Sequence, residues 1–156
     1  MLTSPPASAL SPVPFFRQVE RVGVLCTVDA AAGAAASAPE EGWLCRLARE
    51  ELAALLTGEG KPGVREVVAL SRNDERIADP ATLVVLLHAN TRSQPAGPPL
   101  TALAAALHRA GAGPAPLFLA PPEAIAAVDK TPEGEVRPAL RRLLTAAVAR
   151  PLLANR

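Results

Sequence analysis

Cys26 and His88 are the two residues of this chain whose types could support nucleophilic chemistry. A thiolate is a strong nucleophile, and a neighbouring imidazole can take the proton from a thiol. Cys26 lies in the apolar segment VERVGVLCTVD, and His88 lies near the end of the segment TLVVLLHANT. If both segments form parallel strands, the two side chains lie toward the same sheet edge, where Asp29 or Asn90 could orient the imidazole. Cys26, His88 and Asp29 are therefore candidate catalytic residues of a small cysteine-dependent enzyme.

A structural role for the same residues is the interpretation that we favour. Free cysteines are among the most buried residues, and nothing in the local sequence favours a thiolate at Cys26. His88 is the first polar residue of a strand that reaches solvent. Cys26 and Cys45 could pair in an oxidising compartment, but both have apolar neighbours, so we expect buried thiols that pack as small hydrophobic groups.

The segment GEGKPG at 58–63 matches the G-x-G-x-x-G pattern of dinucleotide-binding proteins. That pattern works when a strand precedes the glycines and a helix follows them, because the helix amino terminus then faces the pyrophosphate. Here a predicted helix precedes the glycines and a predicted strand follows, so we interpret the segment as a helix cap and turn. We expect no cofactor. No phosphate-binding loop, zinc-protease helix, serine elbow or paired C-x-x-C is present either.

Charged residues form two further groups that could bind ions. The acidic loop SRNDERIADP lacks the glycine and the terminal bidentate acid of a calcium loop, so we expect a solvated loop and no metal site. Asp79 before Pro80 suits the start of a turn. The basic residues of the second group could hold an anion, but we expect them to be solubilising charge. They are His108, Arg109, Arg137, Arg141 and Arg142.

Hydrophobic periodicity predicts the elements that position these residues. The segments 22–28, 64–70 and 82–91 have the pattern of strands, and the first should be central and covered on both faces. A helix is predicted between the first two strands, and another near the carboxyl terminus with Pro138 in its first turn. The apolar stripes of these helices are Leu44, Leu47, Ala48, Leu52, Leu55 and Leu56, and Val136, Leu140, Leu143, Leu144, Ala147 and Val148.

The segment Pro99–Ala110 is ambiguous because its alanines and leucines favour a helix by propensity but also alternate as a strand would. As a strand, it gives a two-layer α+β sandwich with a mixed sheet of about four to five strands and two main helices. As a helix, it gives a three-layer α/β sandwich. We expect the two-layer fold, with PLFLA at 116–120 as a further short strand.

Composition limits the partners of the chain. Sixteen basic and fifteen acidic residues give a net charge of +1, and aromatic residues make up 3%, so nucleic acid is not an expected partner. No apolar run is long enough to span a membrane. Fourteen of the sixteen basic residues are arginine, which suggests a GC-rich bacterial genome. We expect a cytoplasmic location, or a periplasmic one if a signal peptide was removed.

The proline-rich segment Met1–Pro14 is predicted to be an extended arm ahead of a single domain at 15–156. Phe15 and Phe16 should anchor that arm on the domain or on a neighbouring subunit. We expect a non-catalytic interaction or assembly protein, because the sequence lacks catalytic motifs, its net charge is near zero, and its apolar terminal segments VPFF and PLLANR could contact other subunits. Its partner would be a second copy of the chain or another protein.

Overall fold

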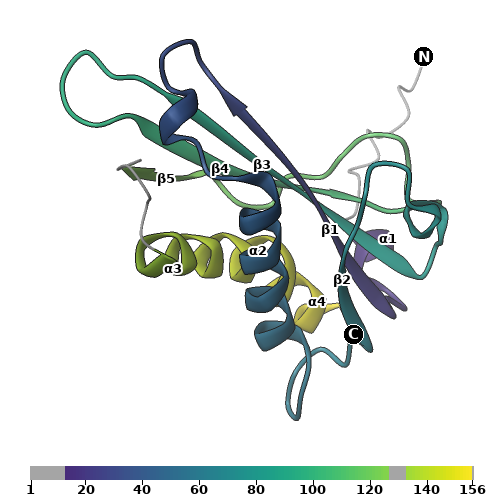
Figure 1. The fold of residues 1–156 in the computed structure, drawn as a ribbon. Helices are drawn as coiled ribbons and strands as arrows, with labels where there is room; N and C mark the ends of the chain where they lie inside the picture. The colour runs from purple at the N-terminus through teal and green to yellow at the C-terminus, as the bar shows by residue number, and fades with distance from the viewer. Residues whose placement is uncertain (1–12, 127–132, 156) are drawn as a thin grey trace, which may run out of the picture.

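The computed structural model describes residues 13–126 and 133–155 and contains one mixed five-stranded sheet with the strand order β2-β1-β3-β4-β5 (Figure 1). The strands are β1 (Arg21–Ala30), β2 (Glu66–Ala69), β3 (Thr82–Arg92), β4 (Leu100–His108) and β5 (Glu123–Ala126). The helices are α1 (Val13–Phe16), α2 (Glu41–Leu56), α3 (Glu133–Leu144) and α4 (Arg150–Ala154). Short helical segments occur at η1 (Ala35–Ser37), η2 (Glu75–Ala78) and η3 (Thr145–Ala149), the last a π-helical stretch that joins α3 to α4.

The sheet has a parallel half and an antiparallel half. β1 lies between β2 and β3 and is parallel to both, whereas β4 is antiparallel to β3 and β5 is antiparallel to β4. The predicted α+β fold with two main helices is thus confirmed. The alternative with a helical Pro99–Ala110 is wrong, because Leu100–His108 pairs along its length with β3. Pairing with a neighbouring strand overrides the weak helix propensity of this segment.

The core fills the space between the sheet and the helices α2 and α3, which cover the same face of the sheet (Figure 1). On this face Val24 of β1 pairs in register with Val85 of β3, which pairs with Leu107 of β4. All three side chains are buried. The predicted apolar stripes of both helices supply the other wall, including Leu44, Leu52, Leu140 and Leu144.

The opposite face of the sheet is only partly covered, so the prediction that both faces of β1 are covered is wrong. Leu70, directly after β2, packs on Gly23, where a Cβ atom would lie 2.3 Å from the Leu70 Cδ1 atom. Toward the carboxyl end of β1, Leu25 and Thr27 on this face are half-buried, and Asp29 is exposed. Val84 of β3 and Ala106 of β4 on this side are buried, whereas Leu25 and Leu86 are only half-buried.

The amino-terminal end is fastened to the domain, which confirms one of the two anchors predicted for Phe15 and Phe16. Both side chains are buried in the main core. The guanidinium of Arg109 donates hydrogen bonds to the backbone carbonyls of Pro80, Pro14, Arg17 and Gln18. The segment VPFF therefore has no free Phe side chain for a neighbouring subunit, contrary to expectation. Residues 1–12 of the predicted arm lie outside the described residues.

Two smaller sequence predictions have opposite outcomes. Gly58, Gly60 and Gly63 all have positive φ angles after the end of α2, which confirms the turn, whereas the residue that caps α2 is Thr57 rather than a glycine. The predicted strand at 116–120 is wrong, because only Leu117 pairs there, in an isolated bridge with Leu107. The strand that completes this edge is β5.

Candidate functional site

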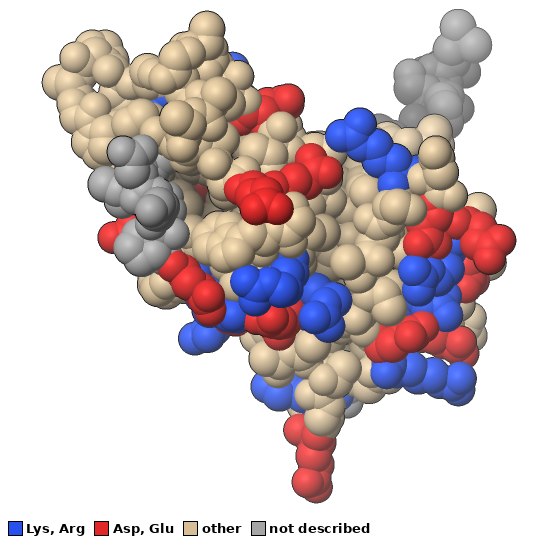
Figure 2. All heavy atoms as spheres, in the orientation of Figure 1, with Lys and Arg blue, Asp and Glu red and all other residues tan. Residues whose placement is uncertain are grey.

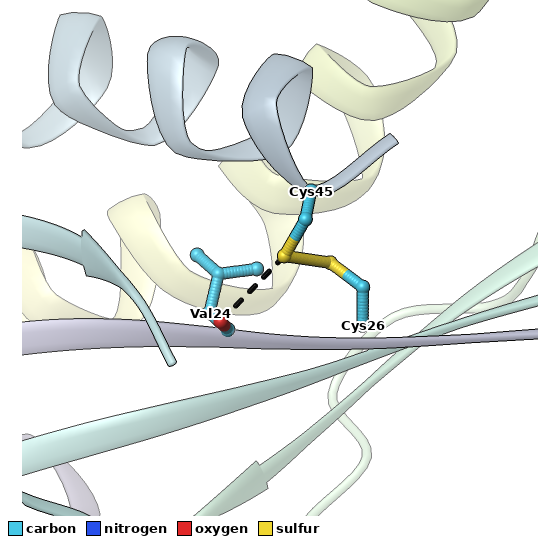
Figure 3. Close-up of a disulfide and its surroundings, with 3 residues drawn as sticks. All are labelled: Val24, Cys26 and Cys45. Atoms are coloured by element: carbon cyan, nitrogen blue, oxygen red, sulfur yellow. Dashed lines mark hydrogen bonds between the residues drawn. A yellow bond between two sulfur atoms is a disulfide. The ribbon is translucent and has the colours of Figure 1, made fainter. Parts of the chain in front are cut away.

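Cys26 and Cys45 form a disulfide that joins the middle of β1 to the first turns of α2 (Figure 3). The Cα atoms of the two residues are 5.6 Å apart, and both residues are buried. The Sγ atom of Cys45 also contacts the carbonyl oxygen of Val24 at 3.6 Å. The expectation of two buried free thiols is therefore wrong. Both cysteines are buried among apolar neighbours, as inferred, but their sulfur atoms are bonded to each other there.

The structure does not bring Cys26 and His88 together, although β1 and β3 are parallel as the catalytic hypothesis required. Cys26 pairs in register with Leu87, and Thr27 pairs with His88. Since successive side chains in a strand point to opposite faces, Cys26 faces the helices and His88 faces the uncovered side. In the disulfide, moreover, Cys26 carries no proton for a base to remove.

His88 instead lies between two side chains of β1, Thr27 and Asp29. The Thr27 Oγ1 atom lies 2.7 Å from His88 Nδ1, and the Asp29 Oδ2 atom lies 3.5 Å from His88 Nε2. The predicted neighbour Asp29 is thus present beside the imidazole. Thr27 was not among the predicted site residues, and only the register of β1 with β3 could have pointed to it.

A hydroxyl, an imidazole and a carboxylate in this order resemble the groups of a nucleophilic triad. Acyl transfer also needs N–H donors directed at the developing oxyanion. At Thr27, β1 is paired with β3, whereas its pairing with β2 ends at Val24. The trio can accept and donate hydrogen bonds at the surface, and its likeness to a triad is limited to the order of the three side chains.

The acidic loop at η2 is organised by arginines. Asp74 accepts hydrogen bonds from the side chain and the backbone N–H of Arg76, and these lower the pKa of Asp74 to about 2. Asp79 pairs with Arg21 and accepts a hydrogen bond from the Ala81 amide, as the predicted turn requires. Within residues 13–126 and 133–155, no three His, Cys, Asp or Glu side chains gather as metal ligands.

Arg137 and Arg141 do not serve as free surface charge, contrary to the prediction, because they join α3 to α2. Both donate to the carboxylate of Glu51, a residue of α2 that is 4% exposed. Burial raises the pKa of Glu51, but the hydrogen bonds from Arg141 and Arg137 outweigh it, and the net pKa is lowered. Arg142 pairs with Glu123 of β5. These ion pairs hold the helical layer together.

Comparison with known proteins identifies a fold but no family. No protein-family model and no curated protein sequence matches the chain. A solved structure of a PelC point variant from Paraburkholderia phytofirmans, described as a dodecamer, matches with a TM-score of 0.55 and 15% sequence identity. The match covers 92% of this chain and 94% of that one.

A second dodecameric PelC structure from the same organism matches with a TM-score of 0.55 and 14% identity, over 85% of this chain and 90% of that one. At this identity the comparison shows a shared fold along almost the whole chain. In the described part of the chain, no helix is both long and apolar enough to cross a membrane.

Proposed function

We propose that this protein is a non-catalytic subunit of a homo-oligomeric assembly. The observation that carries the proposal is the likeness of fold to PelC, whose solved structures are described as dodecamers. The likeness extends over nearly the full length of both chains. The absence of catalytic motifs from the sequence is consistent with an architectural role.

The uncovered sheet face is the surface that best suits contact with a second copy. On this side β4 carries Ala102 and Leu100, which are exposed, and Ala104, which is half-buried. Small apolar side chains on the sheet surface allow close approach of another subunit and lose little entropy when they are buried. The Thr27 and His88 pair supplies polar groups near the centre of the same face.

An uncharged tip continues this surface beyond the helices. It consists of residues 30–39, which follow β1, and residues 93–99, which join β3 to β4, and neither segment contains a charged residue. The amide of Ala31 donates to the carbonyl of Thr91, so the two segments start side by side. Both project past α2 at the upper left of Figure 1, where the surface in Figure 2 is largely tan. Depletion of charge is typical of the cores of subunit interfaces.

The disulfide supports an oxidising location for this assembly, such as the bacterial periplasm. Disulfides persist in exported proteins, whereas reducing systems keep cytosolic thiols reduced. The Cys26–Cys45 bond is buried between β1 and α2, so it forms part of the folded core rather than an exposed pair. Of the two locations that the sequence left open, the disulfide favours the periplasm over the cytoplasm.

A matched pair of alanine substitutions tests where the subunits meet. Ala102 on the uncovered face and Ala54 on α2 are both exposed. We expect Ala102→Glu to reduce the oligomeric mass measured by size-exclusion chromatography with light scattering, because it places a charge in the interface. Ala54→Glu should leave the mass unchanged, and thermal melts should show that both variants fold. Equal masses for the wild type and both variants would exclude this face as the interface.

A further inference from the structure

A cleft with a volume of about 500 Å³ opens between α2, the middle of β1 and the carboxyl end of β2. Its floor is apolar and consists of Leu25, Ala69, Leu70 and the Cys26–Cys45 disulfide. The volume lies within the range of small-molecule sites, and an apolar floor is usual for them. Because the disulfide ties the first turns of α2 to β1, one wall of the cleft is covalently held in place.

The rim of the cleft is positively charged. Arg46 and Arg49 of α2 and Arg72 of the loop after β2 line it, and Glu41 is the one acidic residue among the lining side chains. Arg46 donates to Glu50 at 3.2 Å, but in the described part of the chain neither Arg49 nor Arg72 has a salt-bridge partner. Two guanidinium groups therefore remain available beside an apolar surface, in a protein whose net charge is only +1.

The position of the cleft in the fold also suits a ligand. In open sheets with parallel strands, ligands bind outside the carboxyl ends of the strands, where loops and helix starts diverge. β1 and β2 are such a parallel pair connected by α2, and the cleft lies where β2 ends, beside the middle of β1. The cleft therefore combines volume, charge and location. Leu25 and Leu70 of its floor lie toward the uncovered side of β1, at the β2 end of the sheet, whereas Ala102, which tests the proposed assembly, lies on β4.

We propose that this cleft binds a small organic anion, namely a carboxylate on an aryl or alkyl body. The apolar body lies on Leu70 and the disulfide, and the carboxylate accepts hydrogen bonds from Arg49 and Arg72. Guanidinium groups favour planar carboxylates because two parallel N–H donors match the two oxygen atoms. A cation of the same shape meets repulsion from the same rim.

Isothermal titration calorimetry of the oxidised full-length chain with naphthalene-1-acetate tests this proposal. We expect a dissociation constant of about 1 mM or tighter for this probe. The double variant Arg49→Gln and Arg72→Gln should bind about tenfold more weakly, since both carboxylate donors are lost. A double variant of two exposed arginines outside the cleft, Arg65→Gln and Arg150→Gln, should bind as the wild type does, and 1-naphthylmethylamine should not bind.

Each other outcome overturns the proposal. Absence of binding to the wild type shows that the cleft takes no such anion. Equal binding of the acetate and the amine shows simple apolar adsorption, and equal binding to both double variants places the ligand elsewhere. Thermal melts verify that every variant is folded. The assembly proposal is tested by particle mass and by Ala102 on β4, whereas this proposal is tested by binding and by Arg49 and Arg72, so failure of one is distinguishable from failure of the other.

Discussion

Removal of the Cys26–Cys45 disulfide should cost the protein a substantial part of its stability. The bond closes a loop with a sequence separation of 19 residues between β1 and α2. The loss of chain entropy for a loop of this length gives about 3 kcal/mol at 25 °C. Substituting both cysteines by alanine avoids a buried hydroxyl group, so the double variant Cys26→Ala and Cys45→Ala reports mainly the lost cross-link.

Thermal unfolding followed by circular dichroism measures this effect. For a chain of this size, about 3 kcal/mol corresponds to a fall in Tm of roughly 6–12 °C. Urea unfolding should show the same loss as a lower midpoint, together with a steeper slope, because the unfolded chain without the cross-link exposes more surface. The wild type treated with dithiothreitol should move toward the double variant, whereas the variant itself should not respond to reductant.

Two observations would refute this reasoning. One is the recovery of two free thiols when the unfolded wild type, purified without reductant, reacts with a thiol reagent. The other is an unchanged Tm in the double variant, which would mean that α2 stays on β1 by packing alone. The first result would also remove the support for an oxidising compartment.

Glu51→Gln should destabilise the protein by about 1–3 kcal/mol at pH 7, because two arginines of α3 lose their shared carboxylate. Because the pKa of Glu51 is lowered in the folded protein, its carboxylate stabilises the fold above pH 4.5, and this stabilisation is lost as the pH falls below that value. The free energy of unfolding of the variant should therefore depend less on pH in the acidic range. An unaltered pH dependence would argue against the ion pairs. Glu135→Gln on exposed α3 surface is the control and should leave urea unfolding unchanged. Arg109→Met should cost about 2–4 kcal/mol because four backbone carbonyls lose their donor, and limited proteolysis should then cut the amino-terminal segment faster. The exposed Arg150→Met should match the wild type, and equal cleavage rates in the two variants would contradict the anchoring role of Arg109.

Periodicity predicted the order of strand, helix, strand and strand, because apolar residues at spacings of two or about 3.6 mark faces that must be buried. It could not decide Leu100–His108, since alanine and leucine satisfy both periods. The decision came from the nine-residue pairing with β3, which is a long-range contact. The prediction that both faces of β1 are covered was also wrong, because apolar residues on two sides of a strand do not reveal which side meets a helix.

The candidate site depended on a register that no local pattern contains. Parallel pairing of β1 and β3 was inferred, but a shift of one residue decides whether Cys26 faces His88 or Leu87. The disulfide depended on the rotation of α2 over the sheet, which turns Cys45 toward β1. Arg109 carried no signal either, because its partners are backbone carbonyls distant in sequence.

The mass of the native particle tests the central claim most directly. Sedimentation velocity of the oxidised wild-type chain at micromolar concentration should show one species at a multiple of the 16.1 kDa chain mass. That result would support a homo-oligomeric subunit on a fold shared with dodecameric proteins. A single 16.1 kDa species at every concentration, with no association up to hundreds of micromolar, would contradict the claim.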